Sequence, residues 1–243
     1  MPACQPPRDH GRTARPVPPR GRLCHAIGIL LIIVLAGCGR RDSRDTPRPS
    51  STGSRLAPPP VTVDLIPRGS YGRHRTRPMN PRYITIHSTQ NFSSGADARA
   101  HASILKRGGL KGYNNSLGYI TWHYTVDDGS IYQSLPDREQ GQHADYEGPG
   151  NRYSIGIEMC ENSGNSRSAT LDRTARLTAH LMAKHDIPLR RVVPHQHWQR
   201  IRYSDRKVMG HKNCPHYLLD RGKPGQKWEG FLAKVSSYRA RTR

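Results

Sequence analysis

The sequence has few cysteines and few acidic residues, and its composition excludes several classes of protein. Five cysteines among 243 residues exclude a scaffold held together by many disulfides. A mean hydropathy of −0.79 excludes a polytopic membrane protein. Lys and Arg number 39 against 18 Asp and Glu, yet no long basic run occurs, so we expect no nucleic-acid partner. Clusters of Val, Ile, Leu, Tyr and Trp from about residue 83 onward exclude a fully disordered chain.

The N-terminal region contains one apolar run, and that run is short. Ala26 to Gly37 reads AIGILLIIVLAG, which is shorter than the ~20 residues that a membrane-spanning helix needs. Several arginines precede it, as in a secretory signal peptide. We therefore expect residues 1–37 to be a signal peptide rather than part of the fold.

Residues 35–38 read LAGC and resemble the lipobox of bacterial lipoproteins. The resemblance implies that Cys38 is the lipidated first residue of the mature protein and anchors it to a membrane. Gly39 follows in place of Asp, which implies the outer membrane of a Gram-negative bacterium, with the domain in the periplasm. Residues 38–60 are rich in Pro, Ser, Gly and Arg and predict a disordered tether.

Residues 61–243 predict a single α/β domain, which we expect to be monomeric. Alternating or continuous apolar residues predict strands at residues 83–87, 119–126, 130–134, 154–160 and 192–193. Helical patterns cover residues 96–107, capped by Ser93 or Ser94, residues 170–185, and a C-terminal segment with Trp228 and Phe231 on one face. Strands and helices mixed in this order predict a mixed central β-sheet flanked by helices.

Polar side chains follow several of the predicted strands. His87 ends the first strand, Glu158 lies near the end of another, His195 follows the last, and Cys214 comes 19 residues later. Two imidazoles and a thiolate would leave one position open on a tetrahedral zinc ion. Taken singly, however, a strand histidine or a lone cysteine is more often an inert core residue. These four residues alone are therefore compatible with a zinc hydrolase, but also with ordinary core residues that have no catalytic role.

Four separated motifs carry a more specific signal. They are YITIHSTQN at residues 83–91, WHYTVDDG at 122–129, SIGIEMC at 154–160 and HKNCPH at 211–216. Together they resemble the zinc-dependent N-acetylmuramoyl-L-alanine amidases, a family that includes phage endolysins and peptidoglycan-recognition proteins. The resemblance covers roughly Pro78 to Leu218. It implies a mixed sheet with one zinc ion at its strand ends, and cleavage of the amide between N-acetylmuramic acid and L-alanine in peptidoglycan or muropeptides.

The same resemblance implies a set of metal ligands. His87 corresponds to the first zinc ligand of the family and Cys214 to the third, where many relatives have Asp. We take His195 as the second ligand. His197 and His211 remain alternatives, because residues 199–209 form a longer insertion than is usual before the Lys-Asn-Cys-Pro motif.

The resemblance also implies catalytic and substrate-binding residues. Glu158 matches the family's catalytic Glu, which would move a proton from water to the leaving amine. Lys212 matches a Lys two residues before the third ligand, which would stabilise the oxyanion. His143, in a loop near the cleft of relatives, is expected to contact substrate.

Three further residues in these motifs are expected to support the structure rather than to take part in the reaction. His123 fits a core position or a position behind the metal ligands at least as well as a substrate contact. Trp122 is expected to pack in the interior. Cys160 lies on the same strand face as Glu158, which predicts a position near the metal, and a Cys160–Cys214 disulfide remains an alternative to metal binding.

Two other functions remain as hypotheses. The protein could be a peptidoglycan-binding lipoprotein without activity, since some relatives lack the zinc ligands. It could also be a secreted lysin that attacks competitors, although lipidation argues against release. The presence of both Cys214 and Glu158 favours an enzyme of cell-wall turnover or remodelling.

Overall fold

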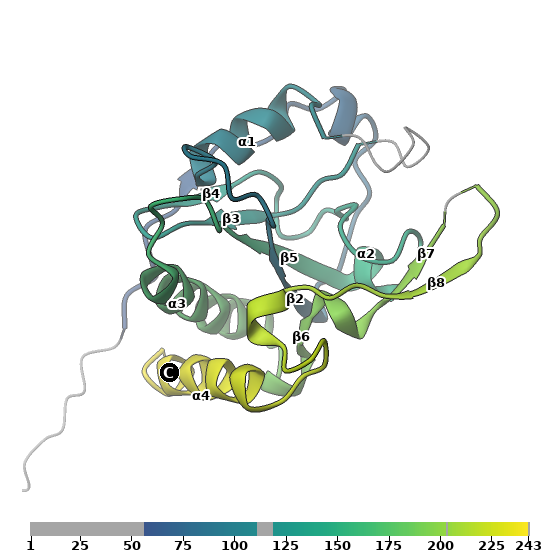
Figure 1. The fold of residues 1–243 in the computed structure, drawn as a ribbon. Helices are drawn as coiled ribbons and strands as arrows, with labels where there is room; N and C mark the ends of the chain where they lie inside the picture. Colours follow the sequence, from purple (N-terminus) through teal and green to yellow (C-terminus); the bar gives the residue numbers. More distant parts are fainter. Residues whose placement is uncertain (1–55, 111–118, 203, 243) are drawn as a thin grey trace, which may run out of the picture. The chain divides into compact units, whose positions relative to one another are not determined.

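The computed structural model describes residues 56–110, 119–202 and 204–242, which form an α/β domain (Figure 1). The predicted signal peptide, Cys38 and most of the predicted tether lie outside the described residues. Within the described ranges, none of the helices combines the length and the apolar character needed to cross a membrane.

A six-stranded sheet forms the centre of the domain. Its order is β1-β4-β3-β5-β2-β6. The strands are β1 (Thr62–Val63), β2 (Tyr83–Ser88), β3 (Tyr124–Val126), β4 (Ile131–Gln133), β5 (Ser154–Met159) and β6 (Val192–Pro194). Strands β3 and β4 pair antiparallel, whereas β3–β5, β5–β2, β2–β6 and β1–β4 pair in parallel. The predicted mixed sheet is therefore confirmed.

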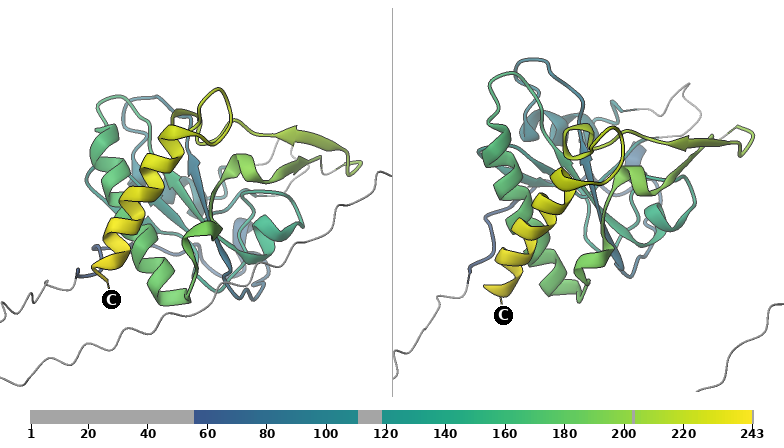
Figure 2. Two further views of the ribbon diagram at one scale, coloured as in Figure 1. Left: turned by 90° about the horizontal axis from the view of Figure 1, so that it is seen from below. Right: turned by 60° about the horizontal axis from the view of Figure 1, so that its bottom comes forward.

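Helices cover both faces of this sheet. They are α1 (Ala98–Lys106), α2 (Pro149–Tyr153), α3 (Arg167–His185) and α4 (Gln226–Ala240). Helices α3 and α4 pack against each other on one face, and α1 lies on the other (Figures 1 and 2). The flanking helices exclude water from both faces of β2, which explains why this strand is an almost continuous buried run.

The main core lies between the sheet and the pair α3–α4. Its fully buried side chains include Ile84, Ile86, Ile155, Ile157, Leu177 and Val235. Trp122 belongs to a smaller cluster with Ile66, Leu105 and Leu135, and its Nε1 donates to Thr125 Oγ1 at 2.7 Å. The expectation that Trp122 packs in the interior is thus confirmed.

Several predicted elements differ from the structure at their ends. Helix α3, expected at residues 170–185, begins three residues earlier, at Arg167. Of the strand expected at residues 119–126, β3 keeps only Tyr124–Val126, because Thr121 pairs instead with the backbone of Gln142 in a neighbouring loop. Helix α1 begins two residues later than expected, at Ala98. Its N-cap is Asp97, whose carboxylate accepts from Ala100 N at 2.7 Å, and not Ser93 or Ser94.

A β-hairpin that the sequence did not predict occupies the insertion. Strands β7 (Gln199–Ile201) and β8 (Val208–His211) pair antiparallel and project from the body of the domain (Figure 1). Near the tip, the guanidinium of Arg206 lies 4.8 Å from the ring centroid of Tyr146. Both strands are largely exposed, so they lack the hydrophobic alternation that identifies a strand in a sequence.

Asp137 is a buried carboxylate that joins the sheet to helix α3. It accepts hydrogen bonds from Lys184 Nζ at 2.8 Å, from His185 Nε2 at 2.7 Å and from the hydroxyl of Tyr124. Burial alone would raise its pKa, but the bonds from His185, Lys184 and Tyr124 hold the pKa well below its ordinary value. The ionised form is therefore favoured by folding.

Replacing Asp137 with Asn is expected to lower the free energy of unfolding at pH 7 by about 2 kcal/mol, because Lys184 and His185 lose a charged partner. A depressed folded pKa contributes stability above the unfolded value of about 4, and this contribution is lost as the pH falls below it. Urea unfolding from pH 7 to pH 3 should therefore show a smaller acid-dependent loss in Asp137→Asn than in wild type. Equal losses in the two proteins would contradict this role.

Candidate metal centre and catalytic site

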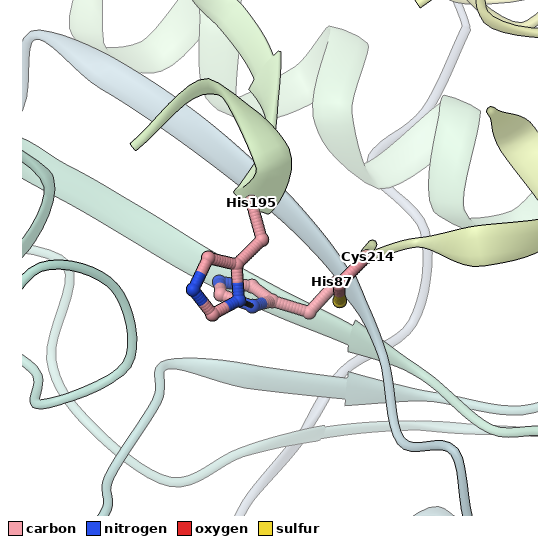
Figure 3. A group of neighbouring side chains, drawn as sticks. All are labelled: His87, His195 and Cys214. Carbon is pink, nitrogen blue, oxygen red and sulfur yellow. Dashed lines mark hydrogen bonds between the residues drawn. The ribbon is translucent and has the colours of Figure 1, made fainter. Parts of the chain in front are cut away.

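Three candidate ligand atoms meet at the carboxyl ends of neighbouring parallel strands. His87 is the next-to-last residue of β2, His195 directly follows β6, and Cys214 follows the β7–β8 hairpin. All three side chains are buried, and their ligand atoms lie within 4.8 Å of one another (Figure 3). Because β2 and β6 are parallel neighbours, their carboxyl ends carry His87 and His195 to the same edge of the sheet.

The hydrogen bonds of His87 determine which of its ring nitrogens is free. Burial lowers the pKa of both His87 and His143 well below the ordinary value, so both rings are neutral. His143 Nε2 faces the carbonyl oxygen of Ser154 at 3.3 Å and must carry its proton, because a carbonyl only accepts. His143 Nδ1 then accepts from His87 Nε2–H at 3.0 Å. The lone pair of His87 is left on Nδ1, 2.9 Å from Nδ1 of His195.

His143 occupies a different position from the one the sequence suggested. Its ring is buried, and both ring nitrogens are engaged inside the protein. The ring thus lies behind His87, and the substrate contact expected from the sequence stays a prediction. Gly156 in β5 makes room for the ring, because a Cβ atom there would lie 2.9 Å from ring atoms of His143.

Cys214 is held against the end of β2. Its Sγ lies 3.3 Å from the backbone N–H of Ser88, which can donate to a thiolate. Burial raises the pKa of the thiol to about 12, and the charge of Glu158 acts in the same direction. An uncompensated thiolate would therefore be unfavourable here, whereas a bound cation would stabilise it.

Glu158 lies beside this group on the adjacent strand. It is the register partner of His87 in the β2–β5 pair, and its Oε1 lies 3.7 Å from His87 Nδ1. Burial raises its pKa to about 8, and the charge of Lys212 opposes the shift. Its Oε2 is buried and has no hydrogen-bond partner among the described residues. The carboxyl is thus available to exchange a proton near neutral pH.

Lys212 supplies positive charge to the same region. Its side chain is half-buried, and its charge lowers the pKa of Glu158, of His87 and of His195. For His195, burial is the larger cause, and the pKa falls to about 3. Both imidazoles are consequently neutral, which is the form that binds metal.

Of the three histidines considered for the second ligand, the structure brings only His195 into the described cluster. His197 is exposed, with its ring 4.6 Å from that of Trp198. His211 lies on β8 and its Nδ1 is 2.7 Å from the carbonyl oxygen of Gln196. Both therefore lie outside the group formed by His195, His87 and Cys214.

His123 and Cys160 also lie outside that group. His123 is completely buried, accepts from Gly156 N at 3.0 Å and donates to the Glu139 carbonyl at 2.8 Å, which confirms a core position. Cys160 and Cys214 are both free thiols, so no disulfide joins them. The sulfur of Cys160 instead faces His101 of α1, 4.0 Å from its Nδ1.

Comparison with known proteins identifies the family to which a chain with this site belongs. Residues 77–217, more than half of the chain, match the family described as N-acetylmuramoyl-L-alanine amidase. The chain belongs to this family. The matched range agrees with the resemblance expected over about residues 78–218, and it contains the whole cluster together with Glu158 and Lys212.

Individual relatives agree with the family match. The chain is 41% identical over 176 residues to the N-acetylmuramoyl-L-alanine amidase XlyA of Bacillus subtilis (strain 168), an alignment that covers 72% of this chain and 50% of XlyA. It is 40% identical over 179 residues to the amidase CwlH of the same organism, covering 73% of this chain and 61% of CwlH. The chain thus spans between half and two thirds of the length of these curated relatives.

Solved structures show the same fold. The catalytic domain of XlyA superposes with a TM-score of 0.58 at 41% identity, covering 72% of this chain and 99% of that domain. The structure of PlyL gives a TM-score of 0.55 at 26% identity, covering 72% of this chain and 96% of PlyL. The amidase fold therefore accounts for most of the described domain.

Two supporting residues were missed by sequence reasoning. Gly156 gives His143 its space, and Ser88 presents a backbone N–H to the sulfur of Cys214. A glycine inside a strand is a signal of close approach by another group, so Gly156 could have been found. The role of Ser88 depends on backbone position and leaves no signal in the sequence.

Proposed function

We propose that the protein hydrolyses the amide bond between N-acetylmuramic acid and the L-alanine of the stem peptide in peptidoglycan. The observation that carries this proposal is the juxtaposition of His87, His195 and Cys214 with the unpartnered carboxylate oxygen of Glu158. Family membership and the similarity to named amidases support the same reaction.

The three buried ligand atoms fit one zinc ion. Two neutral imidazole nitrogens and a thiol are ligands that zinc prefers, and a set of three leaves a position for water or substrate. The raised pKa of Cys214 fits as well, because the site favours a thiolate only beside a cation. Bound there, zinc would lower the pKa of water and polarise the amide carbonyl.

Glu158 would carry the proton through the reaction. As water attacks the amide carbon, the Glu158 carboxylate takes a proton from that water. As the carbon–nitrogen bond breaks, the same carboxyl gives the proton to the nitrogen of L-alanine. The products are the lactyl carboxylate of muramic acid and a stem peptide with a free amino terminus.

Lys212 would stabilise the negative charge that develops on the amide oxygen. Its positive charge lowers the pKa of Glu158 and of both histidines, which supports this role. In a site shielded from water, a fixed positive charge of this kind stabilises an oxyanion strongly.

The reaction can be tested on purified sacculi. Mass spectrometry of the soluble products should show stem peptides with a free N-terminal L-alanine, and glycan strands whose muramic acid keeps an unsubstituted lactyl carboxylate. Binding of the protein to sacculi without any such products would instead support a non-catalytic peptidoglycan-binding protein and contradict the proposed reaction.

His143→Ala is expected to raise the zinc dissociation constant about 10- to 100-fold, because His87 Nε2–H loses the acceptor that keeps its lone pair on Nδ1. Competition with a chromogenic chelator measures this constant, and thermal unfolding of the same sample checks the fold. His197→Ala removes an exposed imidazole outside the cluster and is the matched control. Equal zinc affinity in His143→Ala and wild type would refute the positioning role.

We also propose that the domain is lipid-anchored at Cys38 to the periplasmic face of the outer membrane, and that it acts as a monomer. The lipobox-like residues 35–38 and Gly39 support this location. In a Gram-negative host, the full chain should fractionate with outer membranes and incorporate labelled palmitate, and Cys38→Ser should lose both properties. Label incorporation that persists in Cys38→Ser would place the lipid elsewhere.

A further inference from the structure

One face of the β7–β8 hairpin is strongly basic. Arg200 lies in β7 and Arg202 directly follows it, so the two side chains lie on the same face. Continuing the Ile201–Val208 pairing by one residue places Lys207 opposite Arg202, whose backbone N–H donates to the Lys207 carbonyl at 2.8 Å. Cross-strand partners share a face. Arg200, Arg202 and Lys207 therefore form one surface, which we call the basic face.

The opposite face of the hairpin carries an apolar pair. Ile201 and Val208 are register partners there, and Val208 is 52% exposed. Positive charge is thus segregated to one side of an exposed hairpin. Like charges directly opposite each other in an antiparallel pair are destabilising, and Lys207 lies opposite Arg202. A bound anion would offset this repulsion.

Acidic residues neutralise only part of the basic face. Residues 199–211 contain one acid, Asp205, which accepts from Arg202 Nε at 2.8 Å. Neither Arg200 nor Lys207 forms an ion pair with a carboxylate in the part of the chain that the structure describes. Both side chains are exposed. The basic face therefore keeps two positive charges for an external anion.

The base of the hairpin adjoins the candidate catalytic site. Strand β8 ends at His211, directly before Lys212. His211 Nδ1 lies 2.7 Å from the carbonyl oxygen of Gln196, in the turn that begins with His195. Burial and the charge of Lys212 lower the pKa of His195, and the charge of Arg200 acts in the same direction. The basic face thus begins beside a candidate metal ligand and continues along the projecting hairpin (Figure 1).

The outer part of the hairpin is tied to the loop before α2. The guanidinium of Arg206 lies 4.8 Å from the ring centroid of Tyr146 and 3.9 Å from the carboxylate of Glu147. The backbone N–H of Arg206 donates to the Arg202 carbonyl at 2.9 Å and closes the turn. These contacts hold the hairpin in one direction, and a surface that is already ordered loses less entropy when a ligand binds.

The position of the basic face indicates which anion it meets. A polymer cleaved at the strand ends must pass the base of the hairpin, whereas a membrane on the same face would compete with the substrate for these strand ends. In peptidoglycan, the stem peptides beside the cleaved one carry free carboxylates. Arginine binds carboxylates in bidentate fashion, and lysine binds them as a point charge.

We propose that the basic face binds carboxylates of the stem peptides next to the one that is cleaved, so that the protein acts on glycan strands in preference to single muropeptides. A single muropeptide has one stem, which the catalytic site would occupy, and it leaves the hairpin without a ligand. The inference rests on the proposed amidase function, because it describes the surroundings of the cleaved stem.

Two substrates with the same stem peptide test this assignment: glycan strands with uncrosslinked stems, and the single disaccharide–peptide. Counted per stem, wild type should prefer the strands about fivefold in kcat/KM. The double variant Arg200→Gln/Lys207→Gln should lose this preference, mainly through a higher KM for the strands. The matched control Arg68→Gln/Arg190→Gln removes two exposed arginines outside the hairpin and should keep the preference.

Ionic strength provides a second readout. The screening length falls from about 10 Å at 0.1 M salt to about 3 Å at 1 M, so the wild-type preference for strands should disappear over this range. A preference that salt leaves unchanged, or an equal loss on both substrates in the double variant, would overturn the proposal. Because the substituted side chains are exposed, we expect the double variant to fold.

Co-sedimentation with sacculi separates this inference from the proposed function. Binding that falls in the double variant but not in the control, in a protein that releases no stem peptides, would support the basic face and refute the amidase reaction. Equal cleavage of strands and muropeptides would support the reaction and refute the role of the hairpin. Hairpin-dependent binding to phosphatidylglycerol vesicles, without such binding to sacculi, would assign the basic face to a membrane and overturn the proposal.

Discussion

Glu158→Gln is expected to lower kcat by about 10³-fold, within the range of about 10² to 10⁴ attributed to a positioned acid–base group. The amide of Gln cannot take a proton from water or return one to the leaving amine. The variant should keep its zinc, because Glu158 lies beside the cluster and is not one of its three ligands. Release of stem peptides from sacculi measures the rate, and atomic absorption measures the metal.

Glu229→Gln is the matched control for this experiment. It makes the same chemical change on the exposed first turn of α4, at a residue outside the cluster. Loss of activity in both variants would indicate an effect of overall charge. A Glu158→Gln protein that turned over at the wild-type rate would remove Glu158 from the mechanism.

Cys214→Ala is expected to have the second large effect. With one of three ligands removed, zinc retained after dialysis should fall from about one ion per chain to about a tenth or less, and amide cleavage should disappear with it. The thiol is completely buried against Ser88, so thermal unfolding must show that the variant remains folded before the metal content is interpreted.

Cys160→Ala provides the comparison for metal content. Both cysteines are buried free thiols, but Cys160 lies outside the cluster. Zinc content should therefore stay near one ion per chain in Cys160→Ala. Stoichiometric zinc in Cys214→Ala would show that the metal is held by other residues.

The sequence predicted the location of the site better than its internal arrangement. Ile84 and Ile86 marked β2 as a buried strand, and polar residues after neighbouring parallel strands meet at one edge for geometric reasons. The second ligand remained ambiguous, because three histidines lie within residues 195–211. The turn at His195–His197 buries His195 and exposes His197, and the β7–β8 hairpin carries His211.

Other features depend on contacts that have no local signature. The ring of His143 lies behind His87 because Gly156, on a different strand, leaves space for it. Asp97 caps α1 instead of a serine, because its carboxylate reaches Ala100 N. The exposed hairpin lacks the alternation that reveals a strand. The position of His143 thus depends on tertiary placement, whereas the Asp97 cap is a local contact three residues along the chain.

The most direct test of the account is a metal titration of the chelated protein. Zinc is removed, then returned in steps, while bound zinc and newly formed N-terminal L-alanine are measured in the same samples. We expect amide cleavage to rise in proportion to zinc and to level off at one ion per chain. Full cleavage by the metal-free protein, or no cleavage by a folded protein with one bound zinc, would contradict the central claim.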